Sequence, residues 1–278
     1  MIYLLAVSLL WAFSFGLTKG LTAGLDGTWV AAARLGLALL VFLPFLRPRG
    51  INARLAGALA AIGAVQFGVM YLAYNASFAT LPAYQVALFT LTTPILVTLF
   101  ADAVDRTLRW RALAAALLAV IGTGIVVFQS TAMSDALRGI LWVQLANAAF
   151  AVGQVAYQRV RARRPELRDR DIFALLYAGA FALTLGVACT RDLPATLTAK
   201  NISTLIYLGT IASGLGFFLW NVGATKVNAG TLAVMNNAKV PLAIVCSLLF
   251  FGESANLPRV LASLAVLGTA LWLARKPG

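Results

Sequence analysis

The chain has 278 residues, of which 61% are hydrophobic and 11% are charged, and its mean hydropathy is +0.88. The charged fraction is under half of the ~25% usual for soluble domains, so the composition excludes an ordinary soluble fold and predicts an all-α membrane protein. The net charge of +13 does not indicate nucleic-acid binding, because the basic residues fall between apolar runs. With no histidine and two cysteines inside apolar runs, we expect no metal, no disulfide and no cofactor.

Ten apolar stretches are long enough to cross a bilayer as helices. They are residues 2–18, 28–46, 55–78, 81–101, 110–128, 139–157, 172–190, 202–222, 229–251 and 258–274. The first has no basic leader segment and no cleavage motif, which predicts a retained helix rather than a signal peptide.

The positive charges predict the orientation of these helices. If the N-terminus is cytoplasmic, 15 Lys and Arg residues lie in inside loops and 5 in outside loops, with Arg34 and Lys239 within spans, for 22 in all. This asymmetry predicts that both termini are cytoplasmic. The basic stretch 159–171, between the sixth and seventh helices, is either a topology anchor or a binding segment for anionic lipid headgroups.

The second half of the chain repeats the first at an offset of 146 residues. Tyr71 and Asn75 recur as Phe217 and Asn221 at the same helical spacing. Each half holds five predicted helices, an odd number, so the second half must enter the membrane from the opposite side. Inverted repeats of this kind are typical of secondary transporters, whose substrate site lies near the midplane between the halves.

We therefore predict one membrane unit made of two inverted five-helix repeats, residues 1–132 and 133–278. In this arrangement the aromatic stripe at Tyr71 lies toward the outer face and the stripe at Phe217 toward the inner face. They are either two gates of alternating access or ordinary interfacial aromatic residues.

Two cations lie inside predicted spans. Lys239 is ten residues past Ala229, where an apolar run begins, which is about 15 Å along a helix and half of a ~30 Å hydrocarbon core. It either holds an anionic group of a substrate or pairs with helix carbonyls freed by Pro241. Arg34 is nearer its helix end, where we expect it to reach the interface or to pair with Asp26 or a helix C-terminus.

No carboxylate lies in the middle of a predicted span, so the usual proton carriers of antiporters are absent from the sequence. This favours uniport or facilitated exchange, unless Lys239 itself exchanges a proton. There is also no Walker A motif, no paired nucleophile and base, and no acid pair. We therefore expect no enzyme and no catalytic residue. A lipid-modifying membrane enzyme is the alternative of a different class.

Several short motifs give the chain a family resemblance. They are Leu10-Trp11-Ala12-Phe13-Ser14-Phe15, Thr92-Thr93-Pro94, Val240-Pro241, and Leu249-Phe250-Phe251-Gly252-Glu253 followed by the apolar stretch 258–274. In this order the chain resembles the drug/metabolite transporter superfamily, in its ten-helix EamA-type branch. The first half departs from the pattern, with Ala101-Asp102 in the place of Gly-Glu.

The resemblance implies a central cavity lined by the first, third, fourth, sixth, eighth and ninth helices, in a multi-pass protein of the bacterial inner membrane. It implies export of small metabolites, and the chain is most similar to exporters of amino acids, including aromatic ones. We expect an amino-acid exporter that works by alternating access as a monomer or weak dimer, without a nucleic-acid partner. A multidrug, cation or nucleotide-sugar carrier of the same fold is the alternative.

The substrate-binding residues expected on this basis are polar or aromatic and fall on helical stripes within the spans. They are Lys239 for a carboxylate, Trp11, Tyr71, Tyr74, Tyr84 and Trp220 for the apolar or cationic part, and Ser14, Asn75, Gln144, Asn147, Gln154, Asn221, Asn236 and Asn237 for hydrogen bonds.

Overall fold

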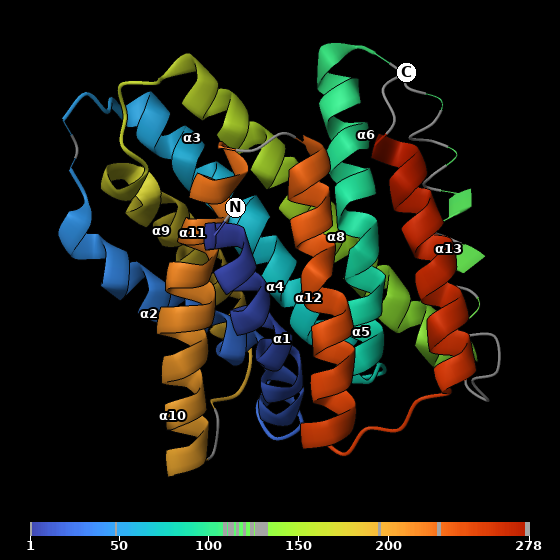
Figure 1. Ribbon diagram of the computed structural model, residues 1–278. Helices are drawn as coiled ribbons and strands as arrows, with labels where there is room; N and C mark the ends of the chain where they lie inside the picture. The colour runs from blue at the N-terminus through green and yellow to red at the C-terminus, as the bar shows by residue number, and fades with distance from the viewer. Residues whose placement is uncertain are drawn as a thin grey trace.

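The computed structural model describes residues 2–47, 49–107, 133–193, 196–226 and 229–275, with residues 110, 114, 117, 118, 121, 122 and 125 in between. Regular structure in this part of the chain is entirely helical (Figure 1). The elements are α1 (Ile2–Thr22), α2 (Gly27–Phe42), η1 (Leu43–Phe45), α3 (Ala53–Gly63), η2 (Ala64–Val69), α4 (Met70–Ser77), α5 (Ala83–Phe89), η3 (Thr90–Thr92), α6 (Thr93–Asp105), α8 (Met133–Arg163), α9 (Asp169–Ala188), α10 (Ala199–Ile206), η4 (Tyr207–Leu215), α11 (Gly216–Ala224), α12 (Ala229–Phe250) and α13 (Leu257–Arg275).

Seven helical runs within the described ranges are long and apolar enough to cross a membrane. They are Ile2–Thr22, Gly27–Phe45, Ala53–Ser77, Ala83–Asp105, Asp135–Arg163, Asp169–Ala188 and Ala199–Ala224. The prediction of an all-α membrane protein is confirmed. Each predicted helical range overlaps a helix of the structure except 110–128, most of which lies outside the described residues.

The helix α8 is longer than the sequence predicts. It runs from Met133 to Arg163, whereas hydropathy gave only residues 139–157. Hydropathy detects only the apolar part of a helix. Gln, Ala and Arg are strong helix formers, and they continue α8 beyond its apolar part. The first residues of the predicted basic loop are therefore helical. The ion pair of Arg161 Nε with Asp169 Oδ1 at 2.8 Å joins the end of α8 to the start of α9.

Polar side chains just before α2, α3 and α10 accept a backbone N–H of the first turn. Asp26 accepts from the amide of Thr28 at the start of α2, and Asn52 accepts from Leu55 at the start of α3, both at 2.8 Å. Thr198 does the same for α10. These caps provide acceptors for backbone N–H groups that have no partner within the helix, where the chain turns between helices.

The helices α3 and α9 approach each other closely because small residues line their crossing. A Cβ atom added at Gly63 would overlap the backbone of Leu176, and one at Gly179 would overlap the carbonyl of Ala60. Neither neighbour is a flexible side chain, so the crossing depends on glycine. By contrast, a Cβ atom at Gly186, also on α9, would meet no other atom within 4 Å.

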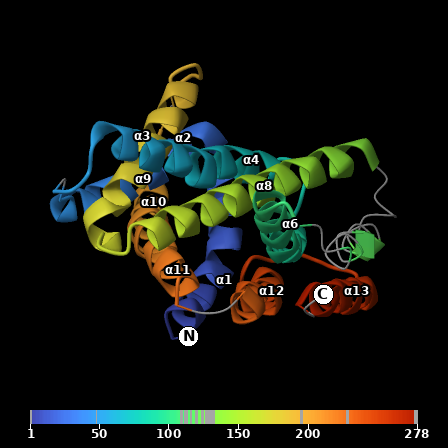
Figure 2. The same ribbon diagram turned by 90° about the horizontal axis from the view of Figure 1, so that it is seen from above.

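The buried side chains form two clusters that meet along α1. One cluster joins α1, α2, the run α3–α4, α8, α9 and the run α10–α11, and includes Trp11. The other joins α5, α6, α12 and α13, and includes Phe15 of α1. Figure 2 shows α1 beside α11 and α12, with α13 on the far side of α12. Because Tyr74 packs against both clusters, the seam between them lies where α1 passes α4.

Replacing Gly179 with Ala should destabilise the protein, because the added methyl group overlaps a backbone carbonyl that cannot move aside. Overpacking of this kind costs about 1–3 kcal/mol. The midpoint of thermal unfolding of the purified protein in detergent measures the effect. Gly186→Ala on the same helix is the matched control and should be neutral or slightly stabilising. Equal shifts for the two variants would contradict the close approach of α3 and α9.

Candidate functional site

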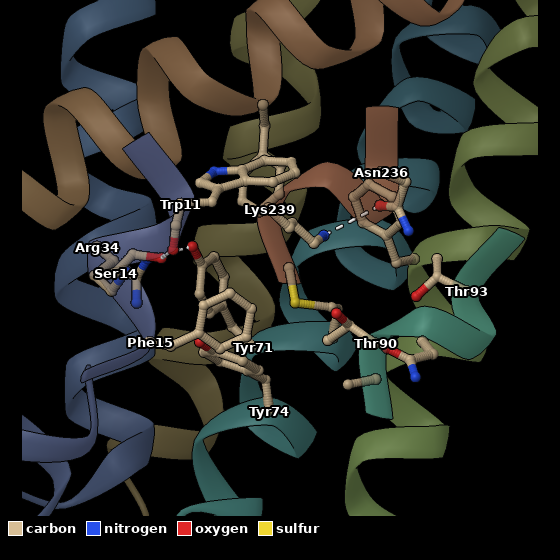
Figure 3. A pocket seen from close by; sticks show the side chains of 15 residues that line it. Trp11, Ser14, Phe15, Arg34, Tyr71, Tyr74, Thr90, Thr93, Asn236 and Lys239 are labelled. Carbon is tan, nitrogen blue, oxygen red and sulfur yellow. Dashed lines mark hydrogen bonds between the residues drawn. The ribbon is translucent and has the colours of Figure 1, made fainter. Parts of the chain in front are cut away.

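A cavity of about 580 Å³, counting the part that opens to solvent, lies at the seam between the two clusters. Seven helical runs contribute to its wall, which is mostly apolar with a few polar groups. Figure 3 shows the side chains that line it. The lining residues are Trp11, Ser14, Phe15, Arg34, Met70, Tyr71, Tyr74, Thr90, Thr93, Ala146, Asn147, Phe150, Phe217, Asn236 and Lys239.

The ammonium group of Lys239 enters this cavity from α12. Its side chain is buried, and Nζ donates to Asn236 Oδ1 at 3.1 Å (Figure 3). Nζ also lies 4.7 Å from the ring centroid of Trp11 and 6.0 Å from that of Trp220. An amide oxygen and aromatic faces therefore stabilise the charge. The described hydrogen bond goes to Asn236 and not to a helix carbonyl freed by Pro241. No described ion pair involves Lys239, so its charge is available to an anion in the cavity.

The indole of Trp11 links α1 to the second half of the chain. Its Nε1 donates to the carbonyl oxygen of Ala212 at 2.9 Å, and its ring lies 5.1 Å from Phe217 and 5.3 Å from Trp220. Trp220 in turn donates from Nε1 to Gln154 Oε1 at 3.1 Å. The Trp11 ring beside Lys239 is thus fixed by a hydrogen bond at its edge and by contacts with two further rings.

Two π-helical segments shape the wall. The segment η2 ends at Val69 and η4 ends at Leu215, so their ends differ by 215 − 69 = 146 residues. Each is followed by a cavity residue, Tyr71 on α4 and Phe217 on α11, at the same offset. A π turn widens the helix and frees a carbonyl from the regular ladder, and such turns are frequent at functional sites. The carbonyl of Ala212, which accepts from Trp11, belongs to η4.

The amides of α8 bind the wall together more than they face the cavity. Asn147 donates to the carbonyl of Phe89 at 3.0 Å and to Thr92 Oγ1 at 2.9 Å. Thr92 donates to Gln144 Oε1 at 2.8 Å. These bonds hold α8 against η3, as interhelical amides do in membrane bundles.

The structure brings together only part of the predicted site. Seven of the predicted residues line the cavity, namely Trp11, Ser14, Tyr71, Tyr74, Asn147, Asn236 and Lys239. Gln144, Gln154 and Trp220 are not among the lining residues. Gln144 accepts from Thr92 and Gln154 accepts from Trp220, whose ring contacts the lining residue Trp11. The side chain of Asn237 lies outside the described residues.

Three further predicted residues are engaged elsewhere. Asn75 donates to the carbonyl of Gly27 at 2.7 Å and joins α4 to the start of α2. Asn221 accepts from Gln66 Nε2 at 3.2 Å, between α11 and η2. Tyr84 lies on α5, and its hydroxyl accepts from Gln85. Helical spacing identified their faces but not which helix each face meets.

Sequence reasoning missed several lining residues. Arg34 was expected at the interface, yet its side chain is only 2% exposed and faces the cavity. The position of this basic residue inside an apolar span was the sequence signal that could have indicated a place in the site. The apolar lining residues, such as Met70 and Phe150, give no sequence signal because they resemble any core residue. The two aromatic stripes do not lie at opposite ends either, since the rings of Tyr71 and Phe217 are 5.8 Å apart.

Comparison with known proteins decides the family. The sequence profile of the EamA-like transporter family matches residues 1–128 and again 137–275. The chain belongs to the EamA-like transporter family. The predicted resemblance to the drug/metabolite transporter superfamily is confirmed, and with it a transporter function and a multi-pass location in the bacterial inner membrane.

The relatives of this EamA-like transporter are named for one substrate. It is 42% identical over 277 residues to a "Probable biotin transporter" of Pseudomonas aeruginosa, covering 98% of this chain and 96% of the relative. It is 40% and 39% identical to proteins named "Biotin transporter" of Salmonella typhimurium and Escherichia coli (strain K12), in each case covering 99% of this chain and 93% of the relative. These names do not support the expectation of amino-acid export.

A solved structure titled "Crystal structure of protein" shares the fold, with a TM-score of 0.67 at 15% identity over 98% of this chain and 96% of that one.

Replacing Trp11 with Phe should destabilise the protein by about 1–3 kcal/mol, because the buried carbonyl of Ala212 loses its donor. Trp29→Phe is the matched control, since Trp29 makes the same kind of bond to the carbonyl of Asp192 on the exposed surface. Its effect should be small because water replaces the lost donor. The free energy of unfolding in detergent and denaturant measures both. A loss for Trp11→Phe no larger than for Trp29→Phe would count against the fixed indole.

Proposed function

We propose that this transporter carries biotin, a monocarboxylate with a neutral polar ring system, across the inner membrane by alternating access. The observation that carries the proposal is the buried ammonium of Lys239 in a cavity whose described lining contains no carboxylate. The names of the relatives support the same substrate. Lys239 binds the carboxylate of biotin, and Trp11, Phe150 and Phe217 contact its apolar body.

The charges around the cavity favour a monocarboxylate over an amino acid. Arg34 and Lys239 both line it, and no described ion pair neutralises either one. A zwitterion would bring an ammonium group toward two cations in a medium of low dielectric constant, where like charges repel strongly. The aromatic face best placed for a substrate ammonium, that of Trp11, already faces Lys239 at 4.7 Å. The same repulsion disfavours cationic drugs.

We further infer ten spanning helices in two inverted halves, residues 1–132 and 133–278, with both termini in the cytoplasm. The tandem family match at residues 1–128 and 137–275 supports the halves. The π-helical segments η2 and η4, which end 146 residues apart, support the same offset. The distribution of Lys and Arg in the sequence supports the orientation.

Contacts between distant segments at one end of the bundle support alternating access. Both carboxylate oxygens of Glu253, which follows α12, accept from the first amides of α5, at 2.6 Å from Ala83 N and 3.0 Å from Tyr84 N. Gly252 has a φ of 65°, a conformation that favours glycine, and turns the chain toward α5. Lys19 on α1 donates to the carbonyl oxygens of Phe78 and Leu81 just before α5. These bonds hold that end together and can break when the cavity opens there.

Replacing Lys239 with Met should weaken transport of biotin. The loss of a charge-assisted hydrogen bond raises the concentration for half-maximal uptake about tenfold or more. Uptake of radiolabelled biotin into proteoliposomes, with and without a pH gradient, gives this value. Because no described carboxylate lines the cavity, we expect uptake that does not need the gradient.

Lys200→Met is the control for the uptake assay, because Lys200 is exposed at the start of α10 and should transport like the native chain. Excess phenylalanine or tryptophan should not compete with biotin. Uptake of these amino acids without uptake of biotin would reject the proposal and return the assignment to amino-acid export.

A further inference from the structure

A second cation in the cavity, Arg34 of α2, is held by hydroxyl groups alone among the described residues. Its Nε donates to Ser213 Oγ at 3.1 Å, one terminal nitrogen donates to Thr18 Oγ1 at 2.8 Å, and the other donates to the Tyr71 hydroxyl at 2.6 Å. Its Cζ lies 4.3 Å from the Tyr71 ring centroid. These partners come from α1, α4 and η4. Together with α2, which carries Arg34, four elements therefore fix the plane of the guanidinium.

The three hydroxyl groups have their own protons directed elsewhere. Thr18 donates to the carbonyl of Ser14 at 2.6 Å, and Ser213 donates to the carbonyl of Leu208 at 2.6 Å. Since the proton of Ser213 is used in this way, the 2.8 Å bond between Tyr71 and Ser213 has Tyr71 as donor. Each hydroxyl therefore accepts from Arg34, and none neutralises its positive charge.

The occupied positions limit what else Arg34 can bind. Ser213 and Tyr71 fill the side edge of the guanidinium, one of the two edges that can pair with both oxygens of a carboxylate. The guanidinium carries N–H groups beyond the three used here. They can donate to an oxygen acceptor of a substrate, while the ammonium of Lys239 can bind a carboxylate at another point of the cavity wall.

The two cations contact α1 at different levels. Lys239 faces Trp11, and Arg34 binds Thr18, seven residues further along α1. Seven residues are two helical turns, so the two cations meet the same face of α1 at levels about 10 Å apart. Extended biotin carries its carboxylate and its urea oxygen at opposite ends, on the order of 10 Å apart with covalent bonds of ~1.5 Å. Figure 3 shows Arg34 on one side of the cavity and Lys239 reaching toward Asn236 on the other.

We propose that Arg34, positioned by Tyr71, Ser213 and Thr18, forms a second polar subsite that binds the urea carbonyl oxygen of the substrate while Lys239 binds its carboxylate. This inference rests on the proposed function, because it assigns the two ends of the same molecule. It makes Arg34 the residue that distinguishes a cyclic urea from other apolar monocarboxylates. The apolar side chains between the cations then contact the aliphatic chain and the thioether ring.

The test is competition against radiolabelled biotin uptake in proteoliposomes by two analogues. Lipoate keeps a carboxylate on an aliphatic chain and a sulfur-containing ring but has no urea. The alcohol analogue of biotin keeps the urea and has no carboxylate. The native chain should prefer biotin to either analogue by about tenfold or more, as expected for one charge-assisted hydrogen bond.

Arg34→Met should remove the preference for biotin over lipoate and leave the preference for biotin over the alcohol intact. Lys239→Met should give the reverse pattern. Met is a suitable replacement because Thr18, Tyr71 and Ser213 keep acceptors for their protons when the guanidinium is gone. Tyr71→Phe keeps the ring and removes one acceptor for Arg34. This variant should lower the preference for biotin over lipoate by a smaller factor than Arg34→Met does. If Arg34→Met does not fold, the result for Tyr71→Phe decides the question.

The outcomes separate the two proposals. Equal losses of biotin and lipoate in folded Arg34→Met and Tyr71→Phe would show that Arg34 only holds the helices together, and would overturn the subsite while biotin transport stands. No interaction of the native chain with biotin would overturn the proposed function and the subsite with it.

Discussion

The structure depends on keeping two positive charges inside an apolar bundle, in a cavity whose described lining contains no carboxylate. A basic side chain at the centre of a spanning helix costs on the order of 2.5–3.5 kcal/mol, and that cost falls only if polar or aromatic groups replace the water that it loses. For Lys239 the replacements are Asn236 and the faces of Trp11 and Trp220. For Arg34 they are three hydroxyl groups and the face of Tyr71. Both sets of partners solvate the charge and leave it uncancelled. At Lys239 this is the state that the carboxylate of a substrate stabilises.

The helix α1 is where these two arrangements meet. Its residues Trp11 and Thr18 contact one cation each, and its apolar residues belong to both clusters of the core. The π turn of η4 supplies both the carbonyl that fixes Trp11 and the hydroxyl that fixes Arg34. An irregular helix is therefore as important to the site as any single side chain. The preferences for a carboxylate at one end and a neutral acceptor at the other both depend on its geometry.

The all-helical membrane architecture follows from the sequence, because hydropathy acts over whole helices. The burial of Lys239 agrees with its place within an apolar run of the sequence. The role of Arg34 could not be predicted in this way, since it depends on Ser213 and Tyr71, which are 179 and 37 residues away in the chain. Asn75, Tyr84 and Asn221 share the residue types of the cavity but face other helices, because periodicity specifies the face of a helix and not its neighbour. The π turns that place Trp11 and Arg34 have no signal that hydropathy can detect.

The most direct test of the central claim measures the distance between the ammonium of Lys239 and the carboxylate of the substrate. Solid-state NMR of the protein in lipid, with ¹⁵N at lysine Nζ and biotin carrying ¹³C in its carboxylate, reports this distance through dipolar dephasing. We predict a carbon–nitrogen distance below about 4 Å, as a charge-assisted hydrogen bond requires, with loss of the signal in Lys239→Met. Bound biotin that shows no dephasing in the native protein, or dephasing that persists in Lys239→Met, would contradict the account.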